Sequence, residues 1–360
     1  MSKKNKILFS GGGTLGPVVP LLAVWQELRD EGEWEPVWMG TKEGPEKEVV
    51  EKQGIRFVAI PSGKMRRYWD WRNITDFFRL GGAFLYSLAY LLFNRPKAIL
   101  TAGGFVAVPV VWAGWILRIP IFVHQQDILV GLANKLMAPF ATKITTVFEK
   151  SLEDFPKNKA IWTGQPIRKE IVEGNKDRAF KNLNFNSEMP VTLIFGGGTG
   201  ASGINHLVYK ALPDLLQWTQ VIHITGKGKD LDHPVPKDPL IDKNYRRFEF
   251  LMESMGDAYA SADLVVSRAG IGSLSEIIAL GKPSIIIPIP DSHQENNARF
   301  LEEKGAIRVL PQKGLLPRDL VVAVRLLLDP SESAKLKSNL KGIMPLDGAE
   351  KMAEVVRKAF

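Results

Sequence analysis

The chain lacks cysteine altogether, and its histidines are few and scattered. Its 360 residues include no cysteine and five histidines. The absence of cysteine excludes disulfides, thiolate nucleophiles and cysteine-based metal sites, and it is typical of a reducing compartment. The histidines, which lack metal-ligand spacing, are at positions 124, 206, 223, 233 and 293. We therefore expect no tightly bound metal and no required cofactor.

Long hydrophobic runs are also missing. The most membrane-like segment, residues 83–93, is interrupted by Ser87 and has about half the length that a spanning helix needs. The N terminus is basic, but residues 7–10 are too short for the apolar region of a signal peptide. We expect a cytosolic protein that touches a membrane without crossing it.

Composition and charge indicate a globular protein with anionic partners. Hydrophobic residues make up 45% and charged residues 24% of the chain, and its length suits two domains. The formal net charge of +8 favours nucleic acid, anionic lipid or phosphorylated small molecules. No RNA-binding signature or long basic run indicates nucleic acid, so we expect the other two.

The first half of the chain reads as alternating strands and helices with glycine turns. A strand at residues 6–10 runs into glycines 11–13 and 16 and then into a helix at 18–29. Such a turn lets the backbone approach a ligand closely, although a plain tight turn is an equal alternative. Gly103 and Gly104 follow another strand, and four polar residues, 124–127, follow a strand at 121–123. Further strands are predicted at residues 35–39, 56–60, 98–101, 143–147 and 161–163, and helices at 46–53, 105–117 and 131–140.

The second half repeats this plan. A strand at residues 191–195 runs into the glycine-rich segment 196–201 and a helix at 205–216. Duplication of a nucleotide-binding α/β half, with a cleft between the halves, is the organisation that this implies. Further strands are predicted at residues 221–224, 248–251, 264–266 and 284–288, and helices from Ser273 and at 315–328 and 349–360.

Residues 261–298 carry the strongest functional signal. A buried strand, a turn through Gly270, a helix and a second strand form a βαβ unit. Ligands of such sheets bind at the carboxyl ends of the strands, where helix N termini attract anions. Glu276, early in this helix, can accept hydrogen bonds from ribose hydroxyls. A polar cluster expected at the same crevice comprises Asp291, His293, Gln294 and Asn297. The segment predicts a nucleotide site.

One stretch of the first half has a membrane-like composition. Basic and aromatic residues alternate from position 64 and lead into the apolar segment 83–93. Aromatic rings beside cations suit a bilayer interface, whereas a buried helix with a solvated entry loop is the plainer alternative. The residues assigned to the membrane are Lys64, Arg66, Arg67, Tyr68, Trp69, Trp71, Phe77 and Phe78.

Six motifs, taken in order, resemble those of glycosyltransferase family 28, in its branch that makes lipid II for peptidoglycan. Residues 12–20 are similar to GGTGGHxxP, and 103–105 with Pro109 are similar to the family's second loop. The others are 124–127 with 131–135 (HEQNxxxGxxNK), 163–168 (TGNPVR), 196–201 (GGSxGA) and the sugar-nucleotide signature at 261–298.

The resemblance implies a GT-B fold of class α/β, with two Rossmann-like domains whose parallel sheets face a central cleft. Residues 1–165 would form the acceptor and membrane-associating domain and 166–345 the UDP-GlcNAc domain. Residues 346–360 would form a helix that packs back on the N-terminal domain. The implied activity is inverting transfer of GlcNAc from UDP-GlcNAc to the MurNAc 4-hydroxyl of lipid I.

The same resemblance assigns site residues. Glu276 would hold the ribose hydroxyls, the backbone near Met252 would meet uracil, and Gln294 with His293 would contact GlcNAc. The other implied donor contacts are Thr14, Leu15, Gly16, Asp127, Arg168, Gly198, Thr199, Ile271, Gly272, Ser273, Leu274 and Ser275. The lipid I diphosphate would lie near Gly12, Gly13, Gly103, Gly104 and Asn134. Further implied partners are the anionic cytoplasmic face of the plasma membrane and other cell-wall synthesis proteins, with no nucleic acid.

Departures from the family motifs concern catalysis. Pro17 replaces the family's histidine, Gln125 its glutamate, and Asp127 its asparagine, while Gly198 replaces a serine. Proline and glutamine cannot act as bases, so we hypothesise that Asp127 takes the acceptor proton, with His124 as the second candidate. The alternative is that Asp127 only keeps the hydrogen-bonding role of the asparagine.

Three other functions stay open. The acceptor-side departures favour a related UDP-sugar transferase with another lipid or natural-product acceptor. A catalytically weak homologue could bind nucleotide and scaffold cell-wall enzymes at the membrane. A nucleotide-sugar epimerase shares the two-domain plan but needs no lipid-facing loop.

Overall fold

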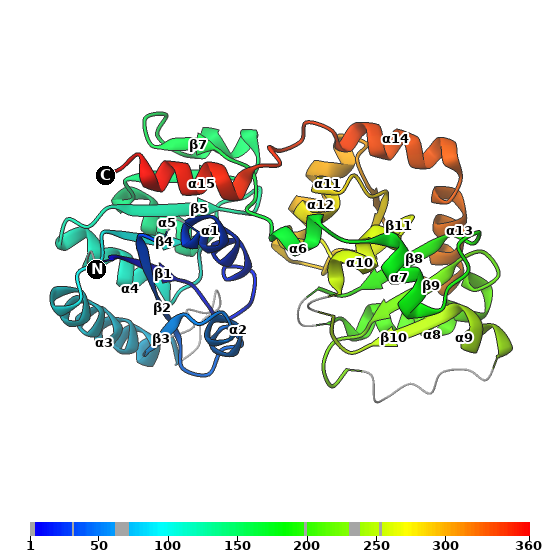
Figure 1. The fold of residues 1–360 in the computed structure, drawn as a ribbon, viewed down its shortest axis with the longest axis horizontal. Helices are drawn as coiled ribbons and strands as arrows, with labels where there is room; N and C mark the ends of the chain where they lie inside the picture. The colour runs from blue at the N-terminus through cyan, green and yellow to red at the C-terminus, as the bar shows by residue number, and fades with distance from the viewer. Residues whose placement is uncertain (1–3, 31, 62–71, 198–199, 230–237, 252–253) are drawn as a thin grey trace. The chain divides into compact units, whose positions relative to one another are not determined.

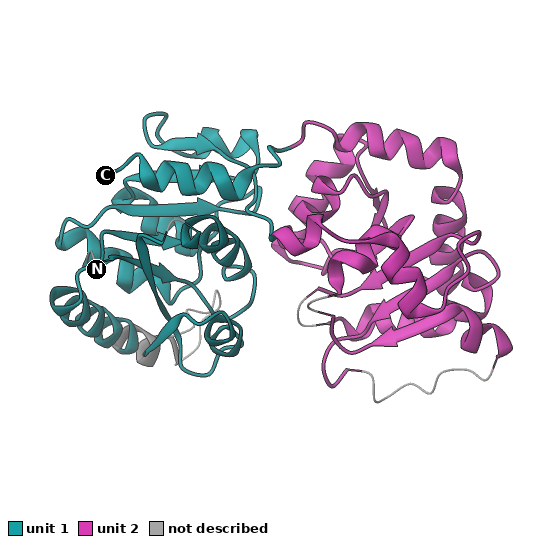
Figure 2. Ribbon diagram, viewed as in Figure 1, with its two compact units in different colours: residues 1–168, 344–360 teal, residues 169–343 magenta. Residues whose placement is uncertain are grey.

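The computed structural model divides the chain into two compact units, each built around one parallel sheet. The structure describes residues 4–30, 32–61, 72–197, 200–229, 238–251 and 254–360, with the backbone alone at 72–78. The first unit comprises residues 1–168 and 344–360, and the second comprises residues 169–343 (Figure 2). The first boundary therefore falls after Arg168 rather than after residue 165, and residues 344–345 belong to the first unit.

The first unit contains a seven-stranded parallel sheet with the strand order β3-β2-β1-β4-β5-β6-β7 (Figure 1). The inner strands β4 and β5 are buried along their whole length, because helices cover both faces of the sheet. The seven strands are β1 (Asn5–Ser10), β2 (Trp34–Thr41), β3 (Arg56–Ile60), β4 (Ala98–Thr101), β5 (Ile121–Gln125), β6 (Lys143–Thr146) and β7 (Ala160–Trp162).

The helices of the first unit include one from the far end of the sequence. Met352, Ala353 and Val356 of the C-terminal helix join the same buried cluster as Leu21 and Leu28 of the first helix (Figure 1). Residues more than 300 positions apart thus complete one core. The helices are α1 (Val19–Arg29), α2 (Glu46–Lys52), α3 (Arg72–Phe93), α4 (Ala107–Ile116), α5 (Leu132–Met137) and α15 (Gly348–Arg357), with the 3-10 turns η1 (Ala138–Phe140) and η2 (Glu149–Asp154).

The second unit contains a six-stranded parallel sheet with the strand order β10-β9-β8-β11-β12-β13. Its strands are β8 (Val191–Phe195), β9 (Gln220–Ile224), β10 (Tyr245–Phe248), β11 (Leu264–Ser267), β12 (Ser284–Ile286) and β13 (Arg308–Val309). Its helices are α6 (Lys169–Val172), α7 (Lys176–Leu183), α8 (Ser202–Leu215), α9 (Pro239–Asn244), α10 (Met255–Ser261), α11 (Ile271–Ala279), α12 (His293–Glu303), α13 (Pro317–Leu327) and α14 (Pro330–Leu340).

Two element boundaries differ informatively from the sequence prediction. β10 ends at Phe248, where the predicted strand began, because Tyr245 must pair with the sheet. The Tyr245 hydroxyl lies 2.9 Å from Nδ1 of His223 on β9, and that ring is fully buried. β5 runs through Gln125, so His124 and Gln125 belong to the strand rather than following it. The predicted strand ended too early because it was recognised by its run of apolar residues, and polar side chains inside a buried strand interrupt such a run.

Both sheets have a point at which the strand order reverses direction. In the first unit this switch point lies between β1 and β4, and in the second between β8 and β11. At such points chain segments leave the carboxyl ends of neighbouring strands in opposite directions, and ligands of α/β sheets generally bind there. The predicted glycine turns follow all four of these strands, and after β11 the turn comprises residues 268–270 and ends at Gly270.

Candidate active site

The start of α11 is the predicted anion-binding feature of the second unit. Its N-cap, Gly270, has extended backbone and makes no side-chain cap hydrogen bond. The first intrahelical bond runs from Leu274 N to the Gly270 carbonyl, so the amides of Ile271, Gly272 and Ser273 precede it. A Cβ built on Gly272 would meet no atom within 4 Å. Three amides at the positive end of a helix, beside open space, suit a phosphate group.

This geometry narrows the predicted diphosphate contacts. The amide of Leu274 is already bonded, and its side chain is fully buried. Ser275 is also fully buried, and its hydroxyl has no partner among the described residues. Leu274 and Ser275 therefore face the interior, which corrects their prediction as ligand contacts and leaves Ile271, Gly272 and Ser273.

Glu276 is held in a fixed orientation at the switch point. The hydroxyl of Tyr259 on α10 donates to its Oε2 at 2.9 Å. The Tyr259 ring packs edge-on against Phe195, the last residue of β8, with ring centroids 5.9 Å apart. The carboxylate is half-buried and can accept several hydrogen bonds at once. Through Tyr259 it is linked to the end of β8, and a carboxylate there suits recognition of a ribose diol.

Residues of α12 adjoin the start of α11. Asn297 is fully buried and donates through Nδ2 to the Ala269 carbonyl at 3.3 Å. A Cβ built on Gly270 would stand 3.9 Å from Nε2 of Gln294, whose Oε1 accepts from Ile289 N at 3.2 Å. The Gln294 amide nitrogen therefore borders the anion-binding helix start. His293 is exposed at the first position of α12.

The first unit brings its two glycine turns together. Gly103 and Gly104 have φ angles of +105° and +90°, which favour glycine. A Cβ on Gly104 would approach the Gly12 carbonyl oxygen to 3.0 Å, and one on Gly103 would approach Asn134 Oδ1 to 3.3 Å. Asn134 is buried, and its Oδ1 has no hydrogen-bond partner among the described residues. The predicted acceptor residues Gly12, Gly103, Gly104 and Asn134 thus form one cluster.

Gln125 shapes the turn that carries Asp127. Its Nε2 donates to the carbonyls of Asp127 and Leu129 at 2.6 and 3.2 Å, and its Oε1 accepts from Asn134 at 2.7 Å. An ionised glutamate has no hydrogen to donate to those carbonyls. Glutamine at this position therefore fits the turn, and it leaves Asp127 half-buried directly beyond the end of β5.

Comparison with known sequences matches both units. Residues 7–146 match the profile of the Glycosyltransferase family 28 N-terminal domain, and residues 191–353 match that of the Glycosyltransferase family 28 C-terminal domain. The chain belongs to glycosyltransferase family 28.

Curated relatives in this family are similar over nearly the whole chain. One from Bacillus cereus is 37% identical over 335 residues, which cover 92% of this chain and 94% of the relative. One from Clostridium botulinum is 35% identical over 358 residues, covering 98% and 99%. Both are named UDP-N-acetylglucosamine–N-acetylmuramyl-(pentapeptide) pyrophosphoryl-undecaprenol N-acetylglucosamine transferase.

Solved structures show the same fold at lower sequence identity. The crystal structure of MurG from Acinetobacter baumannii has a TM-score of 0.74 and 23% identity, covering 99% of this chain and all of that one. The UDP-GlcNAc 2-epimerase of Neisseria meningitidis, bound to UDP-GlcNAc, has a TM-score of 0.69 and 15% identity with the same coverage. The fold is therefore shared by transferases and epimerases, and only the sequence relatives separate the two.

His124 of this family 28 chain is a structural residue. Its ring is fully buried, with Nδ1 2.8 Å from Thr145 Oγ1 and Nε2 2.9 Å from Gln165 Oε1. Burial lowers the pKa of His124 to about 4, a change that the hydrogen bond to Gln165 partly opposes. With both nitrogens occupied and no exposed surface, the ring cannot reach an acceptor hydroxyl. The geometry argues against His124 as the second candidate for the base.

His124 should make stability depend on pH. Between pH 6.5 and about 4, the histidine binds a proton in the unfolded state but stays neutral in the folded state. The free energy of unfolding therefore falls as the pH falls through this window, by at most about 3 kcal/mol. His124→Gln should flatten this dependence. Urea unfolding at pH 7.5 and pH 5 measures it, with the exposed His206→Gln as control. Equal slopes for wild type and His124→Gln would contradict the assignment.

For the other predicted site residues, the assigned roles stay predictions, and some of these residues lie outside the described part of the chain. Thr14, Leu15 and Gly16 lie in the first glycine turn, with Thr14 and Gly16 exposed. Arg168 ends the first unit, and its buried Nε has no partner among the described residues. Outside the described residues lie Gly198, Thr199, Met252, Lys64, Arg66, Arg67, Tyr68, Trp69 and Trp71, and the side chains of Phe77 and Phe78.

Arg268 was not assigned a role from the sequence. It follows β11 directly, is 7% exposed, and donates through Nη1 to the carbonyls of Ile287 and Pro288 at 3.0 and 3.2 Å. Burial lowers the pKa of its guanidinium. The residue fastens the ends of β11 and β12 beside the start of α11. The sequence signal that could have identified this residue is an arginine immediately after a buried strand.

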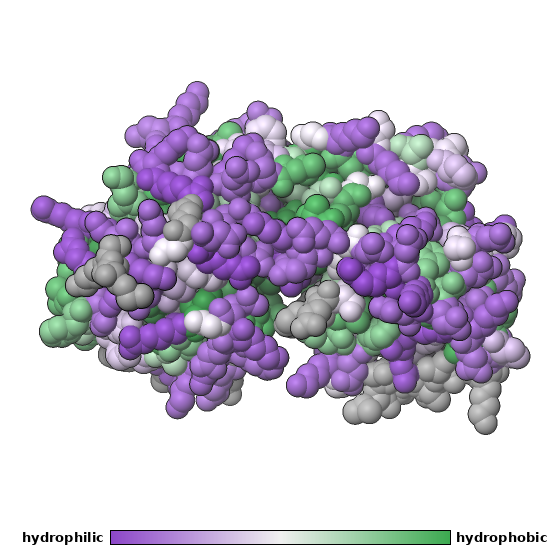
Figure 3. Space-filling model, viewed as in Figure 1, coloured by the Kyte–Doolittle hydropathy of each residue, from purple (hydrophilic) through white to green (hydrophobic). Residues whose placement is uncertain are grey.

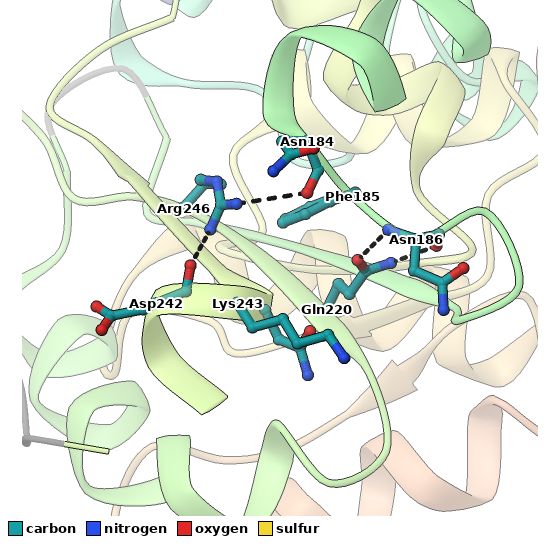
Figure 4. Close-up of a pocket in the computed structure, with 8 residues that line it drawn as sticks. Asn184, Phe185, Asn186, Gln220, Asp242, Lys243 and Arg246 are labelled. Atoms are coloured by element: carbon teal, nitrogen blue, oxygen red, sulfur yellow. Dashed lines mark hydrogen bonds between the residues drawn. The ribbon is translucent and has the colours of Figure 1, made fainter. Parts of the chain in front are cut away.

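A hollow elsewhere in the second unit contains none of the predicted residues (Figure 4). Its volume is about 310 Å³, and its polar groups largely satisfy one another. Gln220 exchanges hydrogen bonds with the Asn186 backbone at 2.7 and 2.8 Å, while Arg246 donates to Leu183 and Asp242 carbonyls. We interpret these contacts as fastening the segment before β8 to the sheet edge.

The described residues bring together no group of three histidine, cysteine, aspartate or glutamate side chains that could hold a metal ion. The expectation that no cofactor is required stays a prediction.

Proposed function

We propose that this protein transfers GlcNAc from UDP-GlcNAc to the MurNAc 4-hydroxyl of lipid I, giving lipid II. The observation that carries the proposal is the similarity to curated transferases of that name over more than nine-tenths of the chain. The helix start at α11, with Glu276 beside it, supports a nucleotide-sugar donor on the second unit.

The proposed reaction is a single inverting displacement. The acceptor hydroxyl attacks the anomeric carbon, its proton passes to a base, and the bond to UDP breaks as the diphosphate takes up the electrons. Asp127 is the proposed base, because it is the carboxylate at the end of β5 beside the acceptor cluster. The amides of Ile271, Gly272 and Ser273 would stabilise the leaving diphosphate, with Arg168 as a further proposed contact.

A transferase with a different lipid or natural-product acceptor is the second candidate. Pro17 and Gln125 support it, since both depart from the family motifs on the acceptor side. UDP release and product mass, measured with a lipid I analogue, test the first proposal directly. No transfer to that analogue, with transfer to another acceptor, would favour the second candidate. Conversion of UDP-GlcNAc without any acceptor would indicate an epimerase, and nucleotide binding without turnover would indicate a scaffold.

An apolar surface on the first unit supports peripheral membrane attachment. Leu85, Leu92 and Phe93 of α3 are 65%, 59% and 88% exposed, and Trp115 and Ile116 at the end of α4 are 53% and 51% exposed. Hydrophobic residues gather at the α3 end of the face seen in Figure 3. Exposed basic residues adjoin the two helix ends, at Arg95, Lys97 and Arg118.

These residues lie where two helices meet. Arg95 Nη2, just beyond α3, donates to the Leu117 carbonyl at the end of α4 at 2.7 Å, which joins the apolar ends of both helices. Among the described helices, none is both long and apolar enough to cross a bilayer. We propose that this surface rests on the anionic cytoplasmic face of the plasma membrane, where other cell-wall proteins are further proposed partners.

Removing two of these apolar side chains should weaken membrane binding. The double variant Phe93→Ser/Trp115→Ser should partition about 10²- to 10⁴-fold less onto vesicles containing anionic lipid, since the two lost side chains together contribute about 3–6 kcal/mol when fully buried. Co-sedimentation measures the partition coefficient. The control is Trp218→Ser, at an aromatic of the second unit that is 43% exposed. Unchanged binding of the double variant would refute this surface as the attachment site.

A further inference from the structure

A buried carboxylate lies beneath the first glycine turn. Glu46, the first residue of α2, has no exposed surface. Its Oε2 accepts from the Gly13 amide at 3.2 Å, and its Oε1 accepts from the amide and hydroxyl of Thr41 at 2.7 and 2.5 Å. One side chain therefore joins the segment that follows β1 to the end of β2.

The surrounding backbone closes tightly around this carboxylate. A Cβ on Gly12 would lie 2.1 Å from Glu46 Oε1, and one on Gly44 would lie 1.9 Å from Oε2. Gly12 in turn contacts the second glycine turn, since a Cβ on Gly104 would lie 3.0 Å from the Gly12 oxygen. A shift of Glu46 would consequently be transmitted through Gly12 to Gly104.

The hydrogen bonds at Glu46 have an electrostatic cause. A buried carboxylate is unfavourable unless its charge is stabilised by donors. Here the described donors are two backbone amides and a hydroxyl, and the residue sits at the positive end of α2. The charge of Glu46 therefore orients the backbone amides of Gly13 and Thr41. Because the Gly13 amide is already bonded, it is not available to a substrate phosphate, which corrects the prediction of Gly13 as a diphosphate contact.

We propose that Glu46 is a positioning residue for the acceptor side: it holds the first glycine turn in the conformation that, with Gly103, Gly104 and Asn134, receives the acceptor. The proposal rests on the acceptor role assigned above to this cluster. It predicts that loss of the Glu46 carboxylate changes acceptor use and leaves the donor site on the second unit unaffected.

Glu46→Gln tests this with minimal change in size. The glutamine NH₂ must face either the Gly13 amide or the Thr41 amide, and two donors cannot bond to each other. We expect the KM for a soluble lipid I analogue to rise about 10- to 100-fold. The KM and calorimetric Kd for UDP-GlcNAc should rise by at most about threefold, because Thr14, Leu15 and Gly16 lie in this turn whereas Glu276 and the start of α11 lie on the second unit. Glu48→Gln on the same helix is the matched control, since Glu48 is exposed and pairs with Lys52.

A second variant covers the case in which Glu46→Gln fails to fold. Thr41→Val removes one donor to Oε1 and keeps the carboxylate, and it should raise the acceptor KM about two- to fivefold with the donor KM unchanged. Equal rises in both KM values, or a lower Tm with unchanged kinetics, would overturn the positioning role. If the wild-type protein transfers nothing to the analogue, the proposed acceptor is contradicted instead. The positioning role is then tested by titration with the analogue, which Glu46→Gln should bind more weakly than the wild type does.

Discussion

Asp127→Asn will lower the single-turnover rate of GlcNAc transfer by about 10²- to 10⁴-fold, the usual contribution of a general base. Asparagine has nearly the same shape as aspartate but cannot take the acceptor proton. The turn should survive the change, because Gln125 holds it through the carbonyls of Asp127 and Leu129 rather than through the Asp127 side chain. Rapid-quench measurement with saturating acceptor and UDP-GlcNAc isolates the chemical step.

A matched control distinguishes a base from a structural aspartate. Asp154→Asn changes an exposed carboxylate of the same unit and should leave the rate unchanged. Undiminished turnover of Asp127→Asn would remove this residue as the base and leave it the hydrogen-bonding role of the family's asparagine.

Glu276→Ala will lower kcat/KM for UDP-GlcNAc by about 10²- to 10⁴-fold and leave the acceptor KM unchanged. The expected loss is that of two hydrogen bonds between ribose hydroxyls and a carboxylate, each worth about 1.5–3 kcal/mol. Tyr259→Phe should give a smaller loss, about three- to tenfold, because it removes only the 2.9 Å bond that orients Glu276. Steady-state kinetics with donor varied at fixed acceptor measures both.

A donor analogue that lacks the ribose 2′-hydroxyl tests whether Glu276 recognises that hydroxyl. Wild type should discriminate strongly against 2′-deoxyuridine-diphospho-GlcNAc, whereas Glu276→Ala should use the two donors almost equally, as expected when the interacting partner is already gone. Glu303→Ala, at the exposed end of α12, is the control. Retained discrimination in Glu276→Ala would show that another group recognises the ribose.

Much of the α/β plan could be predicted from the chain alone. Strands such as β1, β4, β8 and β11 are apolar runs that end at glycine or small polar residues, because helices cover both faces of a parallel sheet. The βαβ unit at β11 and α11 was predicted with its carboxylate, since strand, turn and helix are contiguous there. α12 and α14 were not predicted, because their sequences are mostly polar.

Whether a polar residue is buried or exposed was harder to predict than the strand end near which it lies. His124 and Asp127 lie three residues apart and look equivalent in sequence, yet one is fully buried and the other is half-buried. The difference arises from Thr145 and Gln165, which bond the His124 ring from β6 and from the segment that leaves the first unit. Neither partner is close to His124 along the chain.

The sequence by itself determined the family and the two parallel-sheet halves, because these depend on patterns within short segments. It also predicted donor contacts at Glu276 and Gln294, which stay predictions. Only the tertiary structure decided that His124 is enclosed, that the Gly13 amide is bonded, and that Glu46 supports the first glycine turn. Those facts depend on contacts between segments that follow different strands, and such contacts exist only once the sheet has set its strand order.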